Sequence, residues 1–178
     1  APAQAEVAPA DATHRLDVYI SGYITPHCAV APRGATSLSF GAIMDSHTGE
    51  AVAGSLDLPF SFECNTAYTA SLISRHGGLA VQGGASAPGF SSLVDYSASL
   101  GLAHHDGDLS LDCDSAQMRS TGDYGDEPHS NCKTRSHGHE FSAGDGVVKL
   151  RLKAGGQPLL QGTYSDELLL LISPNVGG

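Results

Sequence analysis

Four of the nine histidines lie in two short segments, where their spacing would suit metal binding. One segment is His104-His105-Asp106-Gly107-Asp108 and the other is His137-Gly138-His139-Glu140. Imidazoles two residues apart on a strand share a face, so they could ligate zinc or copper. Neither segment supplies a complete ligand set. We therefore interpret both as solvated loop residues and predict no metal site.

An acidic stretch raises the separate possibility of a calcium site. Its carboxylates are Asp112, Asp114, Asp123, Asp126 and Glu127. The stretch lacks the D-x-[DN]-x-[DN]-G spacing of a calcium loop. The sequence also lacks a G-x-S-x-G elbow, a P-loop and an H-E-x-x-H helix motif. We expect no catalytic residue and no cofactor, and we predict that the chain is not an enzyme.

Composition and charge narrow the class of protein. The chain has 178 residues, a length typical of one domain. It carries 19 acids against 9 bases, and a net charge of -10 argues against a nucleic-acid partner. Charged residues make up only 16%, glycines number 22 and tryptophan is absent, which favours an all-β extracellular domain. No apolar run is long enough to predict a membrane span.

The cysteines form an even set of four, Cys28, Cys64, Cys113 and Cys132. The absence of C-x-x-C spacing argues against a zinc ribbon. Together with the low charge density, this favours two disulfides and an oxidising compartment. Four cysteines allow three connectivities.

Residues 112–140 interrupt the strand pattern of the rest of the chain. The stretch is polar and acidic, and its apolar residues show no periodicity. Cys113 and Cys132 bracket most of it. We predict a long surface loop that is closed by its own disulfide.

The clearest strand pattern in the chain covers residues 16–24. Its apolar face consists of Leu16, Val18, Ile20 and Ile24, with Gly22 in the remaining position. Polar or aromatic residues alternate with these, so one side of the strand is apolar. The alternation alone is equally compatible with the first strand of the chain's own domain.

Seven further strands are expected from alternation and turn residues. They cover residues 37–43, 55–64, 67–73, 92–102, 109–113, 147–152 and 163–172. This spacing is typical of a β-sandwich or a barrel, and no helix of convincing length is expected.

The last predicted strand, residues 163–172, is the segment around which we expect the rest of the fold to be arranged. Alternation places Tyr164, Leu168, Leu170 and Ile172 on one face of it. An apolar edge strand invites aggregation unless something covers it. Tyr164 follows a turn, and its hydroxyl is expected to bond to a nearby backbone group as in a tyrosine corner.

Several motifs resemble those of the spore coat protein U-like domain family, over about residues 15–174. They are the alternating segment that ends near Cys28, Leu38-Ser39-Phe40-Gly41, Phe60-Ser61-Phe62-Glu63-Cys64-Asn65, Gly77-Gly78-Leu79, Tyr96-Ser97-Ala98-Ser99-Leu100 and Gly162-Thr163-Tyr164-Ser165-Asp166. The family includes the major subunits of archaic, Csu-type chaperone–usher pili. The chain differs in its longer acidic loop and in Leu169 and Leu171, where the family usually has threonine.

The resemblance implies an immunoglobulin-like β-sandwich that lacks its final strand and is completed by donor-strand complementation. Residues 1–24 would form an N-terminal arm and donor strand, and residues 25–178 the pilin domain with its disulfide-closed loop at 113–132. The donor residues would be Leu16, Val18, Ile20, Gly22 and Ile24, and the acceptor groove would present Tyr164, Leu168, Leu170 and Ile172. A bridge between Cys28 and Cys64 is also implied.

By the same resemblance, the chain would be a structural subunit of an extracellular adhesive pilus for surface attachment and biofilm formation. Its partners would be identical subunits, a periplasmic chaperone and an outer-membrane usher. Two alternatives remain: a tip adhesin of the same fold, and a secreted or cell-surface metal-binding β-sandwich.

Overall fold

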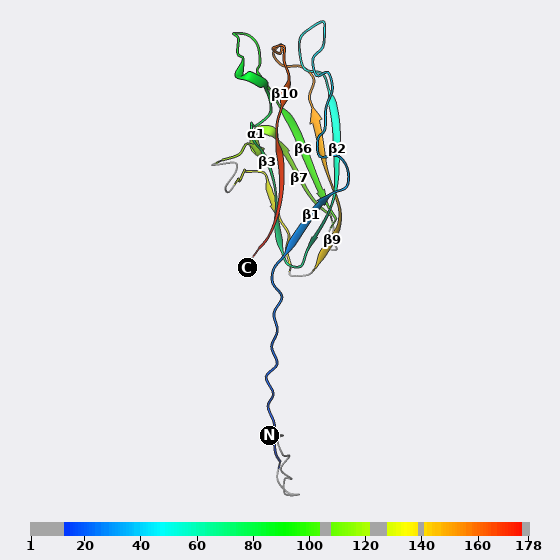
Figure 1. The fold of residues 1–178 in the computed structure, drawn as a ribbon, viewed down its shortest axis with the longest axis vertical. Coiled ribbons are helices and arrows are strands. Elements are labelled where there is room, and N and C mark those ends of the chain that lie inside the picture. Colours follow the sequence, from blue (N-terminus) through cyan, green and yellow to red (C-terminus); the bar gives the residue numbers. More distant parts are fainter. Residues whose placement is uncertain (1–12, 104–107, 122–127, 139–140, 176–178) are drawn as a thin grey trace.

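The chain folds into antiparallel sheets, as the alternating apolar pattern predicts (Figure 1). The computed structural model describes residues 13–103, 108–121, 128–138 and 141–175. Its strands are β1 (Cys28–Pro32), β2 (Gly54–Cys64), β3 (Tyr68–Ser74), β4 (Leu79–Val81), β5 (Leu93–Val94), β6 (Tyr96–Leu102), β7 (Leu109–Asp114), β8 (Lys133–Arg135), β9 (Ser142–Leu152), β10 (Tyr164–Ser165) and β11 (Leu168–Pro174). A 3-10 turn, Gln82–Gly84, and a one-turn helix, α1 (Ser115–Met118), complete the described elements. The predicted all-β class is confirmed.

The largest sheet has five strands in the order β1-β2-β9-β6-β7. Alternation along β2 turns Phe60 and Phe62 into the core. Phe60 lies opposite Gly146 of β9, and a Cβ at Gly146 would lie 2.2 Å from the Phe60 ring. Glycine at this strand position therefore makes room for the aromatic ring.

The second sheet has the order β11-β3-β8, so β11 forms one of its edges. Its buried residues include Tyr68, Leu72 and Ile172, which belong to the same core cluster as Phe60 and Leu100 of the five-stranded sheet. One core is thus shared by the two sheets. The Tyr68 ring meets the Phe62 ring edge-on at 5.8 Å between centroids.

A small third sheet, β10-β4-β5, divides the predicted strand 163–172 into two parts. Tyr164 of β10 pairs with Val81, whereas β11 begins at Leu168 and pairs with β3. The prediction of one continuous strand is therefore wrong. The chain changes sheets at Asp166, whose side chain bonds to residues from two other segments.

The strand predicted at residues 37–43 is also absent. Gly41 has a φ of 72°, a left-handed conformation that extended strands do not adopt. Its N–H donates to Ser39 Oγ at 3.0 Å, which closes a local turn. Phe40 and Ile43 still pack against the core. These two residues are three positions apart, so their packing does not follow the two-residue period of a strand.

The prediction that residues 112–140 form a surface loop is only partly correct. The described part contains α1 and β8, and β8 pairs with β3. Met118 and Ser115 are fully buried, and Ser130 donates its hydroxyl to the Leu72 carbonyl at 2.6 Å. One buried methionine and short polar contacts give no periodic signal, so the sequence pattern did not reveal them.

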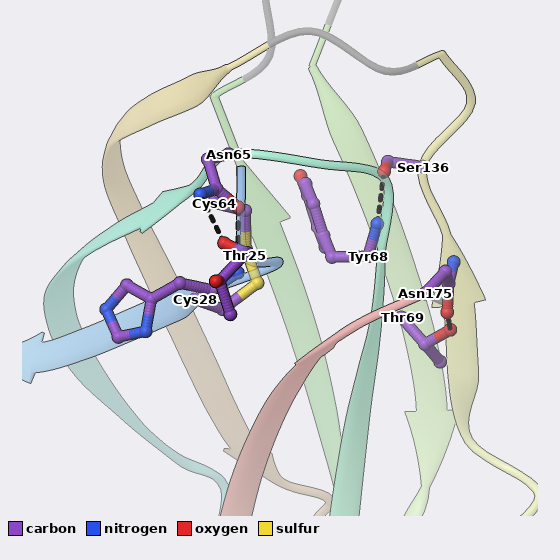
Figure 2. The surroundings of a disulfide bond; sticks show 9 residues. Thr25, Cys28, Cys64, Asn65, Tyr68, Thr69, Ser136 and Asn175 are labelled. Carbon is purple, nitrogen blue, oxygen red and sulfur yellow. Dashed lines mark hydrogen bonds between the residues drawn. A yellow bond between two sulfur atoms is a disulfide. The ribbon is translucent and has the colours of Figure 1, made fainter. Parts of the chain in front are cut away.

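Two disulfides are confirmed, Cys28–Cys64 and Cys113–Cys132. The first ties the start of β1 to the end of β2, where the two cysteines face each other in the ladder (Figure 2). Such bonds persist in oxidising environments, which include the periplasm and the cell exterior. No helix within the described ranges is both long and apolar enough to span a membrane.

The hydroxyl bond expected of Tyr164 is present. Its Oη donates to the Leu160 carbonyl at 2.8 Å and also lies 3.2 Å from the Ser91 carbonyl. Burial raises the pKa of this hydroxyl, and the bond to Leu160 lowers it by a smaller amount. The group is therefore protonated at neutral pH and acts as a donor.

We expect Tyr164→Phe to lower the free energy of unfolding by about 1 kcal/mol, because a half-buried hydrogen bond is lost. Chemical denaturation of the monomer measures this change. Tyr23→Phe is the matched control, since Tyr23 is 93% exposed and its substitution should change stability by less than about 0.5 kcal/mol. Equal stabilities of the two variants would contradict the assigned role of Tyr164.

Candidate functional site: an exposed arm and an open strand edge

Residues 13–27 leave the body of the protein as an extended arm (Figure 1). The arm forms no ladder with any strand in the described part of the chain. Its apolar face is in water: Ile20 is 91% exposed and Leu16 is 86% exposed. Contiguous exposed apolar residues of this kind mark interaction sites in soluble proteins.

The free edge of β11 is the second component of the site. Two hydrogen bonds show which residues of β11 bond to β3. The Arg75 N–H donates to the Glu167 C=O at 2.9 Å, and the Asn175 N–H donates to the Ala67 C=O at 2.7 Å. In an antiparallel ladder, alternate residues direct their N–H and C=O to the same neighbour. Odd-numbered residues of β11 therefore bond to β3.

The even-numbered residues of β11 direct their backbone groups away from β3. These residues are Leu168, Leu170 and Ile172, followed by Pro174, which has no N–H. No strand of the described chain pairs with that side of β11. The edge thus offers three N–H and four C=O groups to an incoming strand.

The same even-numbered residues point their side chains into the core. Ile172 is buried in the core cluster, and Leu168 and Leu170 pack against it together with Tyr164. Leu171, on the opposite face, is 39% exposed. A strand added here would extend the sheet and could place side chains over the same core.

An open edge also exists on β1, at the end of the five-stranded sheet. Val30 faces Phe62 in the ladder, and paired residues project to the same side of the sheet. Phe62 is buried, yet Val30 is 40% exposed. The core is therefore incompletely covered beside β1.

A cavity of about 230 Å³ opens between the two sheets near the start of β11. Its apolar lining includes Leu38, Phe40, Leu56, Leu58, Leu79 and Leu168. β1 pairs with β2 only from Phe60 to Cys64, so Leu56 and Leu58 lie beyond the end of β1. Further walls come from the segment around Phe40 and from Tyr96, Leu150, Tyr164 and Asp166.

Asp166 lies at the polar end of this cavity and holds three segments together. Its carboxylate accepts hydrogen bonds from the Ser74 hydroxyl, from the Tyr96 hydroxyl at 2.5 Å and from the His76 N–H at 3.0 Å. Ser74 Oγ in turn accepts from the Gly77 N–H at 2.9 Å. The network fixes the point at which the chain enters β11.

Most of the metal-site candidates lie outside the described residues. His104, His105, His139 and Glu140 lie outside the described residues, as do Asp123, Asp126 and Glu127. Within the described residues no group of three or more histidine, cysteine or acidic side chains is arranged to hold a metal.

The chain matches no family model and no curated protein. The structure and the residues are therefore the basis for any functional assignment.

Sequence reasoning missed three contributors to this region. Asp166 and Asn65 are part of sequence motifs, but neither was predicted to have a role of its own. Val30 lies in a short strand that was not predicted. Asn65 Nδ2 donates to the Thr25 carbonyl and its Oδ1 accepts from the His27 N–H (Figure 2). Such contacts depend on segments distant in sequence, so spacing could not reveal them.

We expect Asp166→Ala to lower the free energy of unfolding by about 2–3 kcal/mol, because the hydroxyls of Ser74 and Tyr96 lose a charged acceptor. Urea unfolding of the monomer measures the change. Asp57→Ala removes an exposed carboxylate from β2 and should alter stability by less than about 0.5 kcal/mol. An Asp166 variant as stable as the Asp57 variant would show that the network contributes little.

Proposed function

We propose that this chain is the structural subunit of an extracellular pilus, built by insertion of one subunit's arm into the next subunit's open edge. In this proposal the body is an immunoglobulin-like sandwich that lacks one strand, and a neighbouring copy supplies that strand. The observation that carries the proposal is the coexistence of an exposed apolar arm and an unpaired apolar edge in the same chain.

The arm and the edge are complementary in chemistry. The arm has a free backbone and a row of apolar residues, Leu16, Val18, Ile20 and Ile24. The edge has free backbone groups and an uncovered core. Burial of four aliphatic side chains is worth roughly 1.5–3 kcal/mol each, or about 6–12 kcal/mol before the entropy of ordering the arm is subtracted. Up to seven backbone hydrogen bonds to the groups of the β11 edge would add directionality.

Gly22 interrupts the apolar row of the arm. A position without a side chain matches a shallow part of a groove, or a point where an incoming strand can begin to displace another. Because the donated arm and the accepting edge are different surfaces, each added copy exposes a new edge. Contacts of this heterologous kind grow filaments unless they close into a ring.

An exposed edge must be protected before assembly, because it can pair with any extended chain. A periplasmic chaperone that occupies the β11 edge and an outer-membrane usher that exports the subunits would provide this protection. The two disulfides support such a route through an oxidising compartment. The finished filament would serve surface attachment and biofilm formation.

We expect Ile20→Asp to abolish assembly, because it places a charge on the apolar face of the arm. Tyr19→Asp is the matched control on the opposite face, and it should assemble like the unmodified chain. The measurement is an SDS-resistant ladder of oligomers that collapses on boiling. Equal ladders from both variants would refute insertion of this face.

A peptide that spans residues 16–24 should bind to the Ile20→Asp chain, because its acceptor edge is unaltered. The expected complex is one peptide per chain, and the same peptide with the Ile20→Asp change should not bind. Fluorescence anisotropy with a labelled peptide measures both. An Ile20→Asp monomer that ignores the unmodified peptide would rule out strand donation.

A further inference from the structure

The base of the arm is held to the body by one side chain, Asn65, in the turn after β2. Asn65 Nδ2 donates to the Thr25 carbonyl at 2.9 Å, and Asn65 Oδ1 accepts from the His27 N–H at 2.7 Å (Figure 2). The Asn65 backbone N–H donates to the His27 carbonyl at 3.1 Å. The neighbouring Cys28–Cys64 disulfide fixes the distance between the two segments. Thr25, Pro26 and His27 are therefore held as an extended continuation of β1.

The free edge of β11 runs toward this same end of the molecule. Asn175, just after β11, donates its N–H to the Ala67 carbonyl, only two residues beyond Asn65. An arm that folded back beside its own β11 would have to reverse direction between Ile24 and Cys28. It would then run parallel to β11. A second molecule's arm that enters from the Leu168 end would run antiparallel, the slightly more stable pairing.

The sequence at the arm base suits such a reversal. Pro26 would occupy position i+1 of a turn from Thr25 to Cys28, a position where proline is favoured. That turn would bond the Thr25 carbonyl to the Cys28 N–H. In the structure the Thr25 carbonyl accepts from Asn65 instead. Because Asn65 also accepts from the His27 N–H, it holds Thr25 and His27 in the extended conformation and opposes the turn.

Self-insertion would compete strongly with assembly if it were allowed. A tethered segment has an effective concentration of about millimolar, far above that of a second subunit in dilute solution. A linker held in a direction that cannot reach the site has an effective concentration near zero.

We propose that Asn65 is a positioning residue that keeps the arm from entering its own groove and thereby reserves it for another molecule. This inference rests on the proposed function, because it requires that the arm can fill the β11 edge. By preventing self-insertion of the arm, Asn65 would favour filament growth over a closed monomer.

Cleavage by trypsin after Arg15 reports the state of the arm, because Arg15 is exposed in the free arm and would lie beside the donor residues in a filled groove. The full chain is digested at a series of dilutions, and mass spectrometry measures loss of residues 1–15. Protection that depends on concentration indicates insertion into another molecule. Protection that does not depend on concentration indicates self-insertion.

For the unmodified chain we expect rapid cleavage at low concentration and protection as concentration rises. Asn65→Ala should be protected at all concentrations, with cleavage at least tenfold slower at the lowest. Asn65→Asp keeps the acceptor for His27 but loses the donor to Thr25, and it should also be protected. Asn175→Ala is the matched control: it removes the hydrogen bond from the Thr69 hydroxyl at the same end of the body and should behave like the unmodified chain.

Hydrogen exchange on the unmodified monomer gives a second readout that needs no variant. The His27 amide should exchange more slowly than the amides of Tyr23 and Ile24, which lie in the exposed arm. The role of Asn65 is refuted if both Asn65 variants are cleaved like the unmodified chain, or if the His27 amide exchanges as fast as those of the arm. In that case, protection from trypsin that increases with concentration would still support strand donation. If no chain becomes protected at any concentration, the proposed function fails and the inference fails with it.

Discussion

The free backbone groups of Leu168, Leu170 and Ile172 impose the constraint on which the rest of the structure depends. A backbone N–H or C=O beside a core is costly unless it has a hydrogen-bond partner. These residues also direct their side chains into the core, so their backbone cannot simply turn toward solvent. β3 satisfies one side of β11, and the described chain provides no strand for the other. The unpaired side of β11 and the exposed arm are thus two features of one chain that need a hydrogen-bond partner or a cover.

The elements predicted well from sequence are those whose packing produces a regular period. β2 and β6 each turn every second residue into the core, and the predicted limits of β2 differ from the observed ones by one residue. The strand predicted at residues 92–102 is correct only for β6, because its first residues form β5 in another sheet. The segment around Phe40 was mispredicted for a related reason. Leu38, Phe40 and Ala42 alternate as in a strand, but only Phe40 packs against the core, whereas Leu38 and Ala42 are exposed. Gly41 was the local signal against a strand, since glycine there adopts a positive φ.

The candidate site was predictable only in part. The apolar face of the arm and the inward face of β11 follow from alternation, because both are properties of single segments. The Asp166 network and the Asn65 contacts join residues separated by tens of positions, and polar residues in turns carry no periodic signal. The short strands β1, β4 and β8 escaped prediction because three to five residues are too few to define a period. Their existence depends on the partner strands that flank them.

The Cys28–Cys64 disulfide gives the arm a mechanical attachment as well as a chemical one. A pull on the arm first loads the hydrogen bonds of Thr25 and His27 to Asn65 and then passes through the covalent Cys28–Cys64 bridge into β2. β2 is an interior strand, bonded along its whole length to β9. The load is therefore shared in shear by many hydrogen bonds, and the five residues of β1 are spared from peeling away one by one. In the proposed filament, tension would be borne by the sheets rather than by the short strand nearest the junction between subunits.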